Sequence, residues 1–256
     1  MLVLIFTTII TAFAHAADRE KLLTDPGVFA TFAAFRLDED WSKLDKGTRA
    51  AAVSAAKEAL QRHSADAAID TVLLRGLSDH ADVLLRVHAM ELQTNQQIIL
   101  DLLASPLGRH LTPVYVFNGL TKKANYAPAF PDEIKTALKA TPEAGPKRYA
   151  IVIPIRKDAA WWLLDKDART AMMKEHTEAS LPYLKTVKRK LYHSTGLDDF
   201  DFITYFETSS LADFQSLVLG LQQVKENQHN RRFGSPTLLG TIQSIDETLE
   251  ALAAGQ

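Results

Sequence analysis

The stretches WSKLDKGTR at residues 41–49 and WWLLDKDAR at residues 161–169 share tryptophan, Asp-Lys and arginine at a constant offset of 120 residues. The same offset relates Gly76-Leu77 to Gly196-Leu197, and each Gly-Leu pair is followed two residues later by an aspartate. Two separated blocks that keep one offset indicate that the chain contains two copies of one supersecondary unit.

The second copy shows the order of its elements more clearly. Residues 148–155, 188–193, 200–207 and 237–242 have the composition of strands, and Pro154 places the first of them at an edge or a bulge. One predicted helix is capped by Asp165 and ends near Pro182, and another begins after Ser210. The order β-α-β-β-α-β is ferredoxin-like. We therefore predict an α+β fold of two tandem ferredoxin-like units of the dimeric α/β-barrel type, with two antiparallel sheets that each carry helices on one face.

The chain begins with a pattern typical of secretory signals. Residues 1–13 are almost entirely apolar, Ala-His-Ala follows at 14–16, and charged residues come next. We predict a signal peptide over 1–16, cleaved near Ala16, and an exported protein. A buried first helix is the alternative, because no Lys or Arg precedes the apolar run. The other predicted parts are an N-terminal unit without cofactor over 17–126, a Pro-rich linker over 127–147 and a cofactor-binding C-terminal unit over 148–256.

Composition excludes several classes of protein. There is no cysteine among the 256 residues, which rules out disulfides, thiolate catalysis and iron–sulfur clusters. The 29 Lys and Arg against 31 Asp and Glu give no electrostatic drive toward nucleic acid. Beyond the signal no stretch reads as a membrane span, and there is no P-loop, G-x-G-x-x-G or G-x-S-x-G motif.

The two copies differ in three polar residues of the second one. At the constant offset, His176 faces Ala56, Arg189 faces Ile69 and Glu226 faces Pro106. These differences favour one site per chain, in the C-terminal half. His176 lies on the apolar stripe of its helix, so it is either a buried core histidine or a ligand. As a haem ligand it would need a carboxylate such as Glu226 for its second nitrogen.

Arg189 lies in a basic strand whose neighbours point the other way. By strand alternation it shares a face with Leu191, while Lys188 and Lys190 share the opposite face. Arg189 is therefore either a solvated charge or a partly buried guanidinium that holds a small anion. His229 and residues 230–232 are expected at the surface.

A long run of the second copy resembles the chlorite dismutase family. The resemblance rests on Trp161-Trp162, Glu175-His176, VKRKLYHSTGLDD at 187–199, DFITYFE at 201–207, VKEN at 224–227 and GSP at 234–236. In the first half it rests on GLTK at 119–122 and on Asn125-Tyr126. It covers nearly all of the second copy. The long-chain form of the family is periplasmic, which agrees with the predicted signal peptide, so the resemblance implies export to the periplasm.

The resemblance implies one haem b per subunit, bound in the C-terminal unit. It makes His176 the iron ligand, Glu226 the acceptor of its other ring N–H, and Arg189 the catalytic arginine that holds oxyanions near the iron. The other implied cofactor-binding residues are Leu191, Thr204 and Phe206 on the distal wall, Lys157, Trp161 and Trp162 on the proximal side and at the subunit contact, and Lys122, Asn125 and Tyr126 near the propionates.

The implied activity is haem-dependent conversion of chlorite to chloride and dioxygen, with O–O bond formation at the haem. Chlorite is then the small anionic partner, and the long-chain form is expected as a homo-oligomer, a pentamer. Three alternatives stay open: a related haem peroxidase, a coprohaem decarboxylase and a non-catalytic haem-binding module.

Overall fold

The computed structural model describes residues 16–123 and 148–254. Most of the predicted signal peptide and all of the predicted linker, with Asn125 and Tyr126, lie outside the described residues. Within them, no helix is long and apolar enough to cross a membrane.

The N-terminal unit has the predicted element order. Its elements are α1 (Arg19–Thr24), β1 (Phe29–Leu37), α2 (Asp40–Lys43), α3 (Lys46–Gln61), β2 (Ala67–Leu73), β3 (Val83–Ala89), α4 (Leu92–Ala104), the 3-10 turn η1 (Gly108–His110) and β4 (Leu111–Leu120). The strands β1 to β4 and the helices α3 and α4 are the β-α-β-β-α-β unit.

The C-terminal unit repeats this order. Its elements are β5 (Tyr149–Lys157), α6 (Ala159–Leu163), α7 (Lys166–Ser180), η2 (Leu181–Tyr183), β6 (Val187–His193), β7 (Phe202–Thr208), α8 (Leu211–Gln222), η3 (Lys225–His229), β8 (Asn230–Phe233), β9 (Leu238–Gln243) and α9 (Ile245–Ala253). β5 begins 120 residues after β1, and β6 begins 120 residues after β2. The predicted duplication is therefore confirmed.

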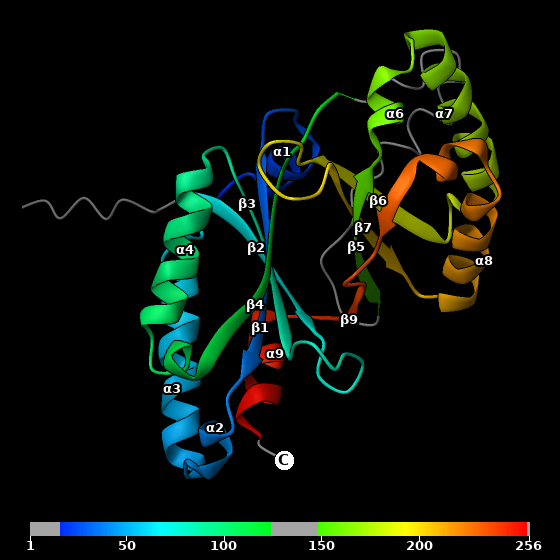
Figure 1. The fold of residues 1–256 in the computed structure, drawn as a ribbon. Coiled ribbons are helices and arrows are strands. Elements are labelled where there is room, and N and C mark those ends of the chain that lie inside the picture. The colour runs from blue at the N-terminus through cyan, green and yellow to red at the C-terminus, as the bar shows by residue number, and fades with distance from the viewer. Residues whose placement is uncertain (1–15, 124–147, 255–256) are drawn as a thin grey trace, which may run out of the picture.

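The strands form one closed sheet rather than the two separate sheets that we expected. Their order is β7-β6-β4-β1-β3-β2-β9-β5-β8, all neighbours are antiparallel, and β5 also pairs with β7, which closes a barrel (Figure 1). Each unit alone would expose two strand edges. The pairs β2–β9 and β4–β6 join these edges across the two units. The alternation of apolar and polar residues within one unit does not indicate which strands pair between the two units.

Of the two positions expected for Pro154, an edge or a bulge, the structure excludes the edge, because β5 has partners on both sides. The pairing of β5 with β9 ends at Val152, and its pairing with β8 begins at Ile155. Pro154 lies between the end of the β9 pairing and the start of the β8 pairing. Its missing N–H therefore removes no hydrogen bond between strands.

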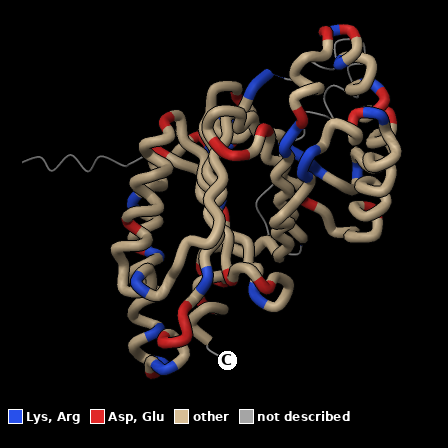
Figure 2. Tube along the Cα trace, viewed as in Figure 1, with Lys and Arg blue, Asp and Glu red and all other residues tan. Residues whose placement is uncertain are grey.

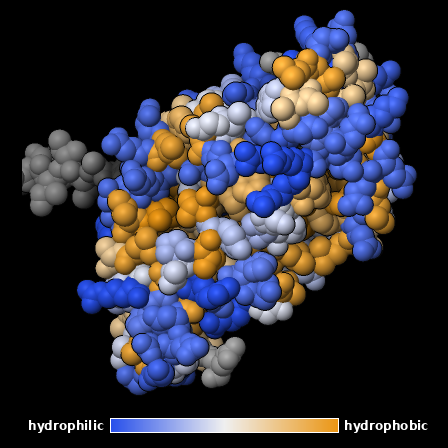
Figure 3. Space-filling model, in the orientation of Figure 1, coloured by the Kyte–Doolittle hydropathy of each residue, from blue (hydrophilic) through white to orange (hydrophobic). Residues whose placement is uncertain are grey.

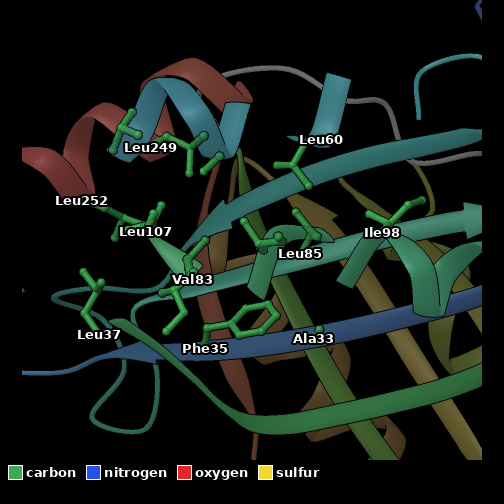
Figure 4. Packing of buried hydrophobic residues seen from close by; sticks show 14 of the residues in the cluster. Ala33, Phe35, Leu37, Leu60, Val83, Leu85, Ile98, Leu107, Leu249 and Leu252 are labelled. Carbon is green, nitrogen blue, oxygen red and sulfur yellow. The ribbon is translucent and has the colours of Figure 1, made fainter. Parts of the chain in front are cut away.

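Helices cover the outside of the barrel, and apolar residues pack both inside the barrel and beneath the helices. One cluster fills the barrel and includes Phe32, Tyr192 and Tyr205. A second lies under α3, α4 and α9, where Leu60, Leu249 and other side chains converge (Figure 4). The third packs α8 against β5, β6 and β7.

The last helix, α9, crosses from the C-terminal unit to pack on α3. Trp41 Nε1 donates to the carbonyl of Leu252 at 2.7 Å, and Arg49 Nε donates to the carbonyl of Ala253 at 2.8 Å. The sequence pattern predicted neither α9 nor its place. α9 covers apolar residues of the first unit. The two copies therefore differ in the helices that pack on them.

A buried ionic cluster joins the two units inside the barrel. Arg86 donates to Asp70 Oδ2 from Nη2 at 2.6 Å, and its Nη1 lies 3.8 Å from Glu207 Oε1. Tyr205 donates its hydroxyl to the same Glu207 oxygen at 2.9 Å, and its ring lies 4.1 Å from the Arg86 guanidinium carbon. Burial raises the pKa of Glu207 to about 7, although Arg86 opposes the effect.

This pKa predicts how stability depends on pH. Between the ordinary glutamate pKa and about 7, the folded protein holds one proton more than the unfolded chain, so stability falls as the pH rises through this window. Glutamine imitates the protonated acid. We expect Glu207→Gln to match the wild type near pH 5 and to exceed it by up to roughly 3 kcal/mol at pH 8.

Urea unfolding across this pH range measures the effect. Glu58→Gln, at an exposed position of α3, is the matched control and should leave the pH profile unchanged. A Glu207→Gln profile parallel to that of the wild type would mean that Glu207 is already ionised in the folded protein near pH 5.

Candidate active site

The candidate site lies in the C-terminal unit, on the helix-covered face of β6 and β7. Arg189 stands opposite Phe206 in the β6–β7 register, and Leu191 stands opposite Thr204. Alternation therefore places all four side chains on one face, as the sequence predicted for Arg189 and Leu191. Phe206 packs with Ile151 and other apolar residues of this face. Figure 2 shows the basic stretch along β6.

The helix α7 brings His176 to a carboxylate of the other helical segment. His176 Nδ1 lies 3.1 Å from Glu226 Oε2, and Glu226, on η3, is only 6% exposed. The Asp165 side chain accepts from Ala168 N at 2.7 Å and so fixes the start of α7. The structure thus joins two of the three residues that the comparison of the copies singled out.

The environment keeps His176 neutral. Burial lowers its pKa to about 4, and the charges of Arg189 and Lys157 act in the same direction. At neutral pH the ring therefore carries one proton, which Nδ1 donates to Glu226. In the part of the chain that the structure describes, no hydrogen bond occupies Nε2. The lone pair of Nε2 is therefore available to a ligand.

Lys157 supports Glu226 from the other side. Its Nζ forms an ion pair with Glu226 Oε1, donates to Asn230 Oδ1 at 2.7 Å, and lies 4.5 Å from the centroid of the Trp161 ring. Burial lowers the pKa of Lys157 to about 8, so the ammonium form still prevails at neutral pH. The corresponding residue of the first copy is Leu37.

Trp161 is held by a cage that both copies share. Its backbone N donates to Asp158 Oδ1 at 2.8 Å, and His229 binds the same carboxylate at 3.1 Å with its ring 5.7 Å from that of Trp161. In the first copy, Trp41 binds Asp38 and packs against His110 in the same way. The cage is thus a feature of the fold, and Lys157 is what the second copy adds to it.

His229 is buried, so its expected surface position is wrong. The ring is needed to cover Trp161, whereas Arg231 and Arg232 are exposed as predicted. Sequence reasoning looked for differences between the copies and missed Asp158, His229 and Asn230. The identity of Asp38 with Asp158 at the same offset was the signal that could have found the cage.

The remaining predicted residues lie at the margins of the site. Trp162 is 43% exposed and stacks on Phe202, and Leu163 beside it is 85% exposed. Figure 3 shows hydrophobic side chains over α6. Lys122 is exposed and lies near His193. Burial lowers the pKa of His193, and the charge of Lys122 lowers it further. Asn125 and Tyr126 fall outside the described residues.

The donor set fits a haem better than a bare metal ion. Among the described residues, no three His, Asp or Glu side chains form a metal-binding group. A single neutral histidine suffices for an iron that four porphyrin nitrogens already hold, and the carboxylate on Nδ1 is the usual partner of such a ligand. The apolar wall of Leu191 and Phe206 suits a flat macrocycle.

The fold is a duplicated ferredoxin-like α/β barrel, and its C-terminal unit pairs His176 with the carboxylate of Glu226. A model of the chlorite dismutase family matches residues 49–243. The chain is 40% identical over 240 residues to the chlorite dismutase of Ideonella dechloratans, covering 93% of this chain and 84% of that protein. The chain belongs to the chlorite dismutase family.

Solved structures agree with this assignment. Chlorite dismutase from Candidatus Nitrospira defluvii, in complex with imidazole, is 56% identical, with a TM-score of 0.88 and coverage of 93% of this chain and 100% of that one. Variants of that protein at an arginine and at two adjacent tryptophans have also been solved. A haem-binding protein from Thermus thermophilus, 19% identical with a TM-score of 0.77 and coverage of 90% of this chain and 96% of that one, shares the fold.

Proposed function

We propose that this protein converts chlorite to chloride and dioxygen with one haem b bound in its C-terminal unit. The observation that carries the proposal is the neutral His176, which donates to Glu226 from Nδ1 and keeps Nε2 available beside a wall that contains Arg189. The relatives that are named chlorite dismutase support the substrate.

Haem b would be held by His176, with Leu191, Thr204 and Phe206 against one side of the macrocycle. Trp161 and Lys157 support the histidine side, and Lys122 would meet a propionate, as the resemblance to the family implies. When bound, the haem supplies a redox-active iron at which the chlorine–oxygen bonds break and the oxygen–oxygen bond forms. The only adjacent tryptophans in the chain are Trp161 and Trp162, which agrees with the solved variants of the Nitrospira protein.

Arg189 binds and orients the anion. A guanidinium on a largely apolar wall meets an oxyanion with directional donors, and the low-dielectric surroundings strengthen the attraction. The same charge retains a negatively charged product of the first bond cleavage until the second bond forms. This role of Arg189 favours chlorite conversion over the peroxidase, decarboxylase and binding-module alternatives.

Glu226 and Lys157 determine the tautomer of His176 and the donor strength of its Nε2. Glu226 accepts the Nδ1 proton, which fixes the tautomer and makes the imidazole a stronger donor at Nε2. The Glu226 carboxylate is only 6% exposed, and burying its charge has a free-energy cost. The ammonium of Lys157 offsets this cost.

A haem titration tests cofactor binding directly. Adding ferric haem b to purified protein should give a Soret band that saturates at one equivalent per chain, with the spectrum of a histidine-ligated iron. A band that never saturates, or one without a histidine signature, would contradict the proposed site.

We also propose export to the periplasm and assembly as a homopentamer. Ala17, the first residue after the predicted cleavage point, donates its backbone N to the carbonyl of Ser64 at 2.7 Å. Trp162 and Leu163 offer apolar surface for a subunit contact. Mass spectrometry of the exported protein should show a chain that starts near Ala17, and sedimentation should show five copies; a full-length chain or a monomer would contradict these proposals.

A further inference from the structure

The buried ammonium of Lys157 is the main addition to the shared tryptophan cage. In the first copy the same position holds Leu37, which needs no polar partner. Lys157 is 6% exposed, so its three N–H groups must find acceptors within the protein. Among the described residues its side chain has two polar partners, Glu226 Oε1 and Asn230 Oδ1.

Asn230 is held in one orientation. It is the first residue of β8 and stands opposite Lys157 in the β5–β8 pairing, next to a shift in the register of β5. Its Oδ1 accepts from Lys157 Nζ at 2.7 Å, and its Nδ2 donates to Asn227 Oδ1 at 3.0 Å. With both ends of the amide in use, the carbonyl oxygen is presented to Lys157 as a neutral acceptor.

The contacts form a chain that ends at His176. Asn230 contacts Lys157, Lys157 contacts one oxygen of Glu226, and the other oxygen of Glu226 accepts from His176 Nδ1. The position of the ammonium therefore decides how much negative charge Glu226 presents to the imidazole. A neutral acceptor at 230 takes part of the hydrogen bonding of the ammonium and so limits how far Lys157 neutralises Glu226.

We propose that Asn230 is a positioning residue that shares the Lys157 ammonium with Glu226 and thereby sets the donor strength of His176. This inference rests on the proposed binding of haem at His176. Within this series of contacts, Lys157 is the one residue that links Asn230 to Glu226.

Two substitutions at this position should act in opposite directions. Asn230→Asp has nearly the same shape but attracts the ammonium, so Glu226 is less neutralised and pulls harder on the Nδ1 proton. The imidazole becomes more like imidazolate and binds iron more strongly. Asn230→Leu removes the acceptor, so Lys157 pairs more completely with Glu226 and the imidazole becomes a weaker donor.

Resonance Raman of the ferrous, haem-loaded protein gives the readout. The iron–histidine stretching frequency should rise in Asn230→Asp and fall in Asn230→Leu, and the haem reduction potential should fall in the first and rise in the second. Simple loss of stability cannot produce shifts of opposite sign. Gln223→Glu adds one negative charge at an exposed residue directly after α8, outside this series of contacts, and is the matched control, with a frequency at the wild-type value.

The outcomes separate this inference from the proposed function. Opposite shifts at position 230 with an unchanged control support it. A wild type with a clear iron–histidine band, and with variants that leave the band in place or move it in the same direction, overturns the role of Asn230 alone. A wild type that binds haem without a histidine band overturns the proposed site and this inference together.

Discussion

Replacing His176 with alanine is expected to abolish tight haem binding. The side chain supplies an imidazole nitrogen, Nε2, that no hydrogen bond among the described residues occupies, and its partner Glu226 is already in place at 3.1 Å from Nδ1. Loss of outer partners of a metal ligand costs about 10- to 100-fold in affinity, and loss of the ligand itself should cost at least the upper value. A Soret titration of the variant against the wild type measures the loss.

Two additions make this experiment specific. Imidazole added to His176→Ala should restore a histidine-like spectrum, because the space left by the side chain can admit the free ring. His63→Ala, which removes a histidine that pairs with Asp101 near the end of α3 in the first copy, should bind haem like the wild type. An unchanged Soret spectrum and affinity in His176→Ala would place the iron ligand elsewhere.

The second large effect is expected for Arg189→Ala. The variant should bind haem normally, because Arg189 lies on β6 and His176 lies on α7. It should release hypochlorite and stop working early, because the charge that retains the anionic product is gone. A hydrogen bond to a charged group is worth about 1.5–3 kcal/mol, so the total oxygen formed per protein should fall roughly 10- to 100-fold.

The measurement combines an oxygen electrode with a halogenation trap for escaped hypochlorite. Arg189→Lys keeps the charge without the planar fork and should lie between the wild type and the alanine variant. Lys188→Ala, on the same strand but on its opposite face, is the matched control and should behave as the wild type. Equal oxygen yield and equal hypochlorite trapping in Arg189→Ala would remove Arg189 from the mechanism.

The internal repeat accounts for most of what the sequence could predict. Local patterns indicated the strands and helices of each unit, since the caps at Asp165 and Ser210 and the turn at Gly196 all depend on neighbouring residues. The comparison of the copies then singled out His176, Arg189 and Glu226 as candidate site residues. His176 and Glu226 meet in space although 50 residues separate them in the chain, because both helical segments cover the same face.

The features that escaped prediction depend on contacts between the two units. Closure of the barrel rests on Leu120 meeting His193 and on Thr71 meeting Gln243, which no local pattern encodes. Arg86 and Glu207 look like ordinary surface charges in the sequence and are buried only because the barrel closes around them. The position of α9 likewise follows from the apolar face that the first unit leaves open.

The most direct test of the account is the fate of chlorite labelled with oxygen-18, added to the haem-loaded protein. Both oxygen atoms of the product should come from one anion. We expect rapid release of doubly labelled dioxygen, one molecule for each chlorite consumed, together with one chloride. Release of no dioxygen from a protein with a full complement of haem, or of dioxygen without the label, would contradict the proposed function.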